Sequence, residues 1–98
     1  MTTSQTFYCK SGDRRASAKA EWRDSAFVVL KGSTAKGYYP KVIPEDMRDA
    51  VVWDDRLNVF QFIRDYNYIA PSNAATFILG YSANGRKLWR DRHGKSMG

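Results

Sequence analysis

The sequence has almost none of the residues from which disulfides, metal sites and most catalytic centres are built. Of its 98 residues, one is a cysteine (Cys9) and one is a histidine (His93). A single cysteine excludes an intrachain disulfide, and no cysteine–histidine spacing suits zinc. The neighbours of Cys9 include Phe7 and Tyr8, which favours a buried, inert thiol because reactivity requires a lowered pKa. His93 precedes a glycine in an expected turn, where a plain surface role is more common than catalysis.

Long apolar runs and phosphate-binding loops are also missing. No apolar stretch approaches the ~20 residues that cross a bilayer, and residues 1–10 lack the basic-then-apolar layout of a signal peptide. Neither familiar spacing of a glycine-rich phosphate loop occurs. We therefore expect a cytoplasmic, non-enzymatic protein with no membrane partner, no bound metal and no cofactor.

The composition is that of one folded domain. Hydrophobic residues make up 43% of the chain and charged residues 27%. The aromatic share of 14% is high, and each large aromatic side chain can bury on the order of 150–250 Å². A chain of 98 residues can form one core but not two. We expect a single α+β domain over residues 16–98, with residues 1–15 as an N-terminal extension that contains a candidate edge strand.

Several segments have the patterns of β-strands. Residues 16–23 alternate between alanine or tryptophan on one face and polar side chains on the other, and this period of two indicates a half-exposed strand. Asp24-Ser25 suits a hairpin turn, and the apolar, β-branched run at 26–31 indicates a more buried strand. Further short strands are expected at residues 6–10, 57–63, 66–70 and 86–90.

Two segments have the patterns of helices. Residues 44–54 begin with Pro44, which suits a first turn, and acidic residues follow where the helix dipole favours anions. A second helix begins near Pro71, can be capped by the Ser72 hydroxyl, and ends at Gly80. Its core-facing stripe would consist of Ala74, Phe77, Ile78 and Tyr81. The sum is an α+β fold, an antiparallel sheet of four to six strands with two helices packed on it.

Beyond the second helix the chain becomes strongly basic. Asn84-Gly85 is the strongest short-range hairpin or turn signal in the chain, and it should be followed by a strand at 86–90 and a turn at 91–94. Residues 86–95 carry five cations against one anion, Asp91. The formal charge of the whole chain is +6, with a net +5 in residues 10–41 and a net −3 in residues 45–65. Segregated charge steers anions to one side of a protein, so we expect a polyanionic ligand.

The candidate phosphate contacts are cations from the two basic segments. They are Arg86, Lys87, Arg90, Arg92, Lys95, Lys31, Lys36 and Lys19. Trp89 lies among them, either as a core anchor, which we favour, or as a ring that stacks on an unpaired base. Tyr38 and Tyr39 are the other candidates for stacking. The carboxylates in residues 45–55 are most simply the solvated face of the first helix.

Two runs of residues resemble a known family. The first is the apolar strand 27–33, which ends in Lys-Gly-Ser and follows the alanine-rich strand 16–20. The second consists of Ser72, Ala74, Ala75, Leu79-Gly80, Ser82-Ala83-Asn84-Gly85, Trp89 and Gly94-Lys95. Together they resemble the domain of unknown function 4357 family, a small module often attached to the C-terminus of restriction-modification and nuclease-like proteins. The second half is also similar to the restriction enzyme and adenine methylase associated domain.

The resemblance implies a DNA-linked accessory module that acts alone, as an oligomer, or beside a separate nuclease or methylase subunit. Relatives usually carry an aromatic residue just after the Asn-Gly pair, where this chain has Arg86, and a cation there favours contact with the nucleic-acid backbone. We therefore expect a small module that binds nucleic acid, with DNA as the first choice. The alternative is a protein-interaction module that uses the acidic helix 45–55 and the loop Tyr38-Tyr39-Pro40 as its interface.

Overall fold

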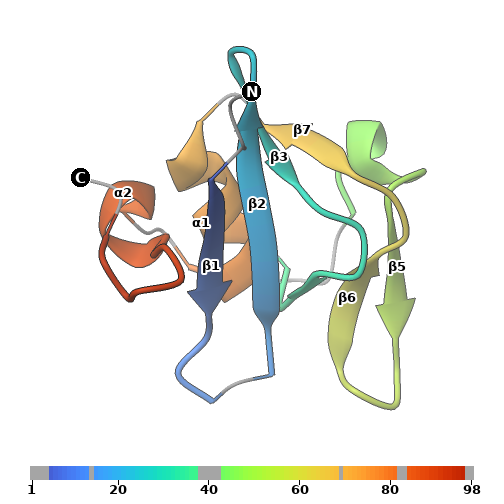
Figure 1. Ribbon diagram of the computed structural model, residues 1–98. Coiled ribbons are helices and arrows are strands. Elements are labelled where there is room, and N and C mark those ends of the chain that lie inside the picture. The colour runs from blue at the N-terminus through green and yellow to red at the C-terminus, as the bar shows by residue number, and fades with distance from the viewer. Residues whose placement is uncertain (1–4, 14, 38–42, 69, 82–83, 97–98) are drawn as a thin grey trace.

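The computed structural model describes residues 5–13, 15–37, 43–68, 70–81 and 84–96, which form an α+β fold of two antiparallel sheets and two α-helices (Figure 1). The first sheet has the order β1 (Thr6–Lys10), β2 (Ser17–Arg23), β3 (Ala26–Val29) and β7 (Tyr66–Tyr68). The second has the order β4 (Thr34–Ala35), β6 (Val59–Phe62) and β5 (Val51–Asp54). The α+β class is confirmed, and the strands are divided between two sheets instead of forming one.

A bend in the chain after β3 separates the two sheets. Gly32 has a φ of +93°, a left-handed conformation that glycine adopts readily. The Gly32 amide donates to the Phe62 carbonyl, and the Phe62 amide donates to the Ser33 carbonyl, each at 2.8 Å. The backbone therefore leaves β3 and pairs at once with β6, so the second sheet begins at the point where the first one ends.

The alternation predicted for residues 16–23 is confirmed by the register of the first sheet. Ala20 pairs with Phe7 of β1 on one side and with Val29 of β3 on the other. Side chains that pair directly share one face of a sheet, and these three are buried. The predicted turn at Asp24-Ser25 joins β2 to β3, with Asp24 at a φ of 56°.

Helix α1 (Pro71–Leu79) covers the inner face of the first sheet and lies behind β1 and β2 in Figure 1. It ends as predicted at Gly80, which has a φ of +82° and an amide that donates to the Thr76 carbonyl at 2.9 Å. The expected Ser72 cap is wrong, because Ala70 occupies the capping position and no side chain caps the helix. Tyr81 is 60% exposed and does not continue the apolar stripe, because the helix has already ended.

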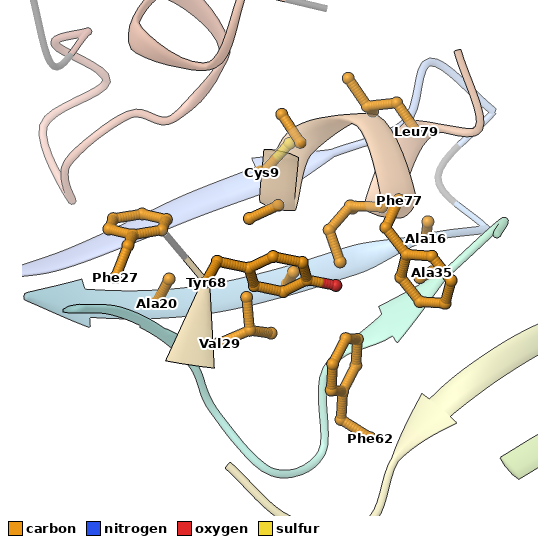
Figure 2. Packing of buried hydrophobic residues seen from close by; sticks show 14 of the residues in the cluster. Cys9, Ala16, Ala20, Phe27, Val29, Ala35, Phe62, Tyr68, Phe77 and Leu79 are labelled. Carbon is orange, nitrogen blue, oxygen red and sulfur yellow. The ribbon is translucent and has the colours of Figure 1, made fainter. Parts of the chain in front are cut away.

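The core lies between α1 and the two sheets. Ring centroids of Phe77 on α1 and Phe62 on β6 are 5.9 Å apart, and those of Phe77 and Phe60 are 5.5 Å apart. Figure 2 shows Phe62 and Phe77 facing one another, with Val29 and Tyr68 of the first sheet beside them. One apolar core therefore serves both sheets.

The helix predicted for residues 44–54 is wrong. Only the one-turn 3-10 helix η1 (Glu45–Met47) forms, and the chain then enters β5. Val51 pairs with Phe62, and Trp53 pairs with Phe60 at a ring-centroid distance of 4.8 Å. The β-branched and aromatic residues of this segment gain more from pairing with β6 than from the helix that the proline and acidic residues suggest.

The hairpin turn at Asn84-Gly85 and the strand at 86–90 are also wrong. Asn84 caps the one-turn helix α2 (Gly85–Leu88), and its side-chain oxygen accepts a hydrogen bond from the Arg86 amide at 3.2 Å. The chain becomes extended only after Trp89, where Arg90 forms an isolated antiparallel bridge with Tyr8 of β1. The expected turn at 91–94 is confirmed, with the Gly94 amide donating to the Asp91 carbonyl at 3.0 Å.

Candidate nucleic-acid interface

Five exposed cations come from α2 and the segment that follows it. We refer to these five exposed residues together as the C-terminal basic surface: Arg86, Lys87, Arg90, Arg92 and Lys95. In Figure 1, α2 lies at one end of the molecule, beyond β1, and β5 lies at the other end. The acidic segment 45–65 is therefore remote from the C-terminal basic surface and does not neutralise it.

Trp89 anchors this surface to the core. Its side chain is 0% exposed and packs edge-on against Phe27 with ring centroids 5.0 Å apart. Its indole N–H donates to the Pro71 carbonyl of α1 at 3.0 Å. The favoured interpretation of Trp89 as a core anchor is confirmed, and stacking of Trp89 on a base is wrong because the ring has no accessible face.

The start of α2 is locked to the start of α1. The Gly85 amide donates to the Ser72 hydroxyl at 3.1 Å, so Ser72 joins the two helices instead of capping its own. A Cβ atom on Gly85 would lie 2.5 Å from both the Pro71 carbonyl oxygen and the Ser72 nitrogen. Only glycine lets the two backbones approach this closely. Ser72 and Gly85, which belong to the pattern that resembles the family, thus have a structural role.

Asp91, the one anion within residues 86–95, organises the backbone of the loop. Its Oδ1 accepts hydrogen bonds from the His93 amide at 2.8 Å and the Lys95 amide at 3.0 Å. The bond from the Lys95 backbone is the main cause that lowers the pKa of the Asp91 carboxyl. Arg90 closes the same loop, because its Nη1 donates to the Gly94 carbonyl at 2.9 Å. These bonds therefore fix the backbone of the loop from which Arg92 and Lys95 project and the side chain of Arg90.

The three cations predicted from the first basic segment lie in different places. Lys19 is exposed on β2 and lies directly opposite Tyr8 in the register, so it extends the C-terminal basic surface across the first sheet. Lys36 forms a 2.7 Å ion pair with Asp13, and this hydrogen bond is the largest cause that holds the pKa of the Asp13 carboxyl well below its usual range. Lys31 follows β3, and its amide donates to Asp65 at 2.8 Å. Lys31 and Lys36 are thus each next to a carboxylate.

Two further residues, which are not among the candidates expected from the sequence, lie beside these cations. Tyr8 and Lys10 alternate with the buried Phe7 and Cys9, so their side chains lie on the opposite face of β1. That alternation was a signal for an outward-facing tyrosine and lysine, but it could not show that Arg90 would become their neighbour. Tyr38 and Tyr39 lie outside the described residues.

The described residues also bear on metal sites, membrane-spanning helices and reactive thiols. Within these ranges, no group of three or more histidine, cysteine, aspartate or glutamate side chains is arranged to hold a metal ion. None of the helices in the described part of the chain combines the length and apolar content that a bilayer-spanning helix needs. Cys9 is buried, and burial raises the pKa of its thiol to about 11.

Comparison with known proteins identifies a family. The family model described as Domain of unknown function (DUF4357) matches residues 7–98, and the chain therefore belongs to this family. No curated protein and no solved structure matches the chain.

Proposed function

We propose that this member of the DUF4357 family is a small, non-enzymatic module that binds nucleic acid through its C-terminal basic surface and Lys19. The observation that carries the proposal is the set of exposed cations on α2 and the following loop, whose one local carboxylate is engaged with backbone amides. A ligand with regularly spaced negative charges satisfies several such cations at once, and release of its counterions drives the association.

The arginine and lysine side chains would contact phosphates in different ways. Arg86 and Arg92 present planar guanidinium groups that can hold a phosphate with two hydrogen bonds, whereas Lys87 and Lys95 act as point charges. Such contacts bind the sugar–phosphate backbone and carry no sequence information by themselves. The proposal therefore predicts strong dependence on salt and weak dependence on base sequence.

DNA is the nucleic acid that we propose first. The support is the resemblance of the chain to modules associated with restriction-modification and nuclease-like proteins. In that setting, the module would work beside a separate nuclease or methylase subunit. It would bring the partner to DNA through backbone contacts, while the chemistry would belong to the partner.

The direct test is a fluorescence-anisotropy titration with labelled single-stranded and duplex oligonucleotides. If about four phosphates are neutralised, affinity should fall on the order of 100-fold between about 50 and about 200 mM salt. The double variant Arg86→Glu/Lys87→Glu should bind more weakly, with a salt slope lower by about two units, one for each lost phosphate contact.

The double variant Arg56→Glu/Arg64→Glu is a matched control. Both arginines are exposed in the segments that flank β6, away from α2, and the control changes the net charge by the same amount. It should retain most of the affinity. Equal losses in the two double variants would show that net charge alone matters, and no saturable binding at about 50 mM salt would reject the proposal.

The protein-interaction alternative has lost one of its two supports, the predicted acidic helix. The acidic segment 45–55 forms a 3-10 turn and a strand instead of a helix, and the loop Tyr38-Tyr39-Pro40 lies outside the described residues. Nucleic-acid binding is therefore the one function that we propose.

A further inference from the structure

The outer face of the first sheet carries an aromatic ring between two cations. Tyr8 of β1 pairs with Lys19 of β2 on one side and with Arg90 on the other. The bridge to Arg90 consists of two hydrogen bonds, from the Tyr8 amide at 2.7 Å and from the Arg90 amide at 2.9 Å. Directly opposed residues in antiparallel strands point to the same face, with Cβ atoms about 5 Å apart. We call Arg90, Tyr8 and Lys19 the Tyr8 row.

The surroundings of the Tyr8 row are positively charged. Lys10 lies two residues along β1 from Tyr8, so it shares the face and is exposed. Glu21 shares the face as well, two residues along β2 from Lys19. However, the Glu21 carboxylate is engaged by the Arg23 guanidinium at 2.7 Å. Glu21 therefore leaves the positive charges of Lys10 and Lys19 available to a ligand. The Nη1 of Arg90 donates to the Gly94 carbonyl, and the other N–H groups of this guanidinium can still donate to a phosphate.

The Tyr8 row lies on the side of the first sheet that α1 does not cover. Helix α1 packs on the other face, behind β1 and β2 in Figure 1. That inner face receives the buried side chains Phe7 and Cys9, and Tyr8 is only partly buried between them in the sequence. Among the side chains that the structure describes, none hydrogen-bonds to the Tyr8 hydroxyl. The core thus makes little use of this ring, which distinguishes it from Trp89.

We propose that the Tyr8 row is a stacking platform for single-stranded nucleic acid, on which one unpaired base lies against Tyr8 while Arg90, Lys19 and Lys10 hold the adjoining phosphates. This inference rests on the proposed nucleic-acid binding and adds which form of nucleic acid is bound. The face of a base is hidden inside a duplex and becomes available only in an unpaired strand. An aromatic ring beside cations that follow the backbone is the arrangement that single strands need.

The test compares Tyr8→Leu with Tyr8→Phe in anisotropy titrations with a labelled single-stranded oligonucleotide and the matching duplex. Tyr8→Leu keeps an apolar side chain at this partly exposed position and removes the ring. We expect it to weaken single-strand binding by about 5- to 150-fold, the range that loss of one base–aromatic stack corresponds to. Tyr8→Phe keeps the ring and should bind as the unaltered protein does.

Tyr81→Leu is the matched control, because Tyr81 is 60% exposed directly after α1 and lies off the first sheet. It should leave binding unchanged. Urea unfolding of each variant shows whether it is folded. As a second measurement, an oligonucleotide that carries 2-aminopurine should show quenching on binding to the unaltered protein and to Tyr8→Phe, with much less quenching for a folded Tyr8→Leu variant.

The outcomes separate this inference from the function on which it rests. If the unaltered protein binds neither oligonucleotide, both proposals fall. If it binds but folded Tyr8→Leu binds single strands equally well, or if duplex is preferred with no effect of Tyr8, only the stacking platform is overturned. A selective loss of single-strand affinity in Tyr8→Leu, with Tyr8→Phe and Tyr81→Leu unaffected, supports it.

Discussion

The indole of Trp89 donates a hydrogen bond of 3.0 Å to the carbonyl oxygen of Pro71, and this bond joins the end of α2 to the first turn of α1. The ring is fully buried against Phe27. Because the bond ties two short elements together, it determines where the C-terminal basic surface begins. Trp89, Gly85 and Ser72 all belong to the pattern that resembles the family, and all three make this connection. Family membership therefore indicates the fold more directly than it indicates an activity.

Replacing Trp89 should destabilise the fold by removing this bond. Trp89→Phe keeps an aromatic ring but removes the indole hydrogen bond to the Pro71 carbonyl, which costs about 0.5–1.5 kcal/mol, and the smaller ring adds a cavity. Urea unfolding followed by circular dichroism measures the loss. Trp22→Phe is the control. Because Trp22 is 37% exposed, this variant should lose much less free energy of unfolding than Trp89→Phe. Similar losses in the two variants would contradict the anchoring role of Trp89.

Gly85 should tolerate no side chain. Gly85→Ala places a Cβ atom against the Pro71 carbonyl and the Ser72 nitrogen, so either α2 moves away from α1 or the backbone distorts. Overpacking of this kind costs about 1–3 kcal/mol, and rigid backbone atoms favour the upper part of that range. Gly12→Ala is a matched control, because a Cβ atom on Gly12 has no neighbour within 4 Å. In thermal unfolding, the Tm should be markedly lower for Gly85→Ala and should change little for Gly12→Ala.

The Cys9 thiol should be unreactive in the folded protein. Burial raises its pKa to about 11, so the thiolate fraction near pH 8 is on the order of 100-fold lower than in the unfolded chain. Stability should accordingly fall as pH rises through the unfolded value of about 9 towards the folded one, because the unfolded chain ionises first. The rate at which Cys9 reacts with a colourless aromatic disulfide reagent, with and without urea, measures the reactivity of the thiol. A native rate equal to the unfolded rate would show that Cys9 is accessible, and Cys9→Ala provides the blank.

The Asp91 carboxyl should stay ionised at pH values below those at which an aspartate usually becomes protonated. The hydrogen bonds from the Lys95 and His93 amides favour its charged form and lower its pKa in the folded state. The stability that this carboxylate contributes is thus present above the unfolded value of about 3.9 and is lost as pH falls through the lower folded pKa. A carbon-13 NMR titration of the carboxyl group measures the folded pKa directly. Asp91→Asn should show a weaker dependence of stability on pH in that window, and an unaltered dependence would contradict the loop-organising role.

The strands with a clear period of two were predictable, and those that depend on distant partners were not. Residues 16–23 alternate because one face contacts the core and the other contacts solvent, so the pattern is visible locally. Residues 51–54 have no such pattern, since Val52 is 42% exposed and Trp53 is partly buried. Their strand is stabilised by pairing with β6, and the preceding proline and acidic residues favoured a helix instead.

The sequence showed which cations belong to the candidate site, but it could not show which residues lie next to them in the structure. Composition pointed to Lys36 and Lys31, but the Lys36 ammonium is paired with Asp13 and the Lys31 backbone amide donates to Asp65. Composition did not point to Tyr8, which comes 82 residues before Arg90 and pairs with it through an isolated antiparallel bridge. A pairing between the two ends of a chain leaves no local periodicity, so no window of the sequence contains it.

By itself, the amino-acid order determined the α+β class, the strands with alternating side chains, the end of α1 at Gly80 and the excess of positive charge near the C-terminus. Each of these depends on interactions within a few residues or on simple composition. Only the tertiary structure decided that the strands form two sheets, that residues 85–88 are helical, and that Trp89 is buried while Tyr8 faces outward between cations. Those outcomes depend on contacts between segments far apart in the chain, where packing and backbone pairing outweigh local preference.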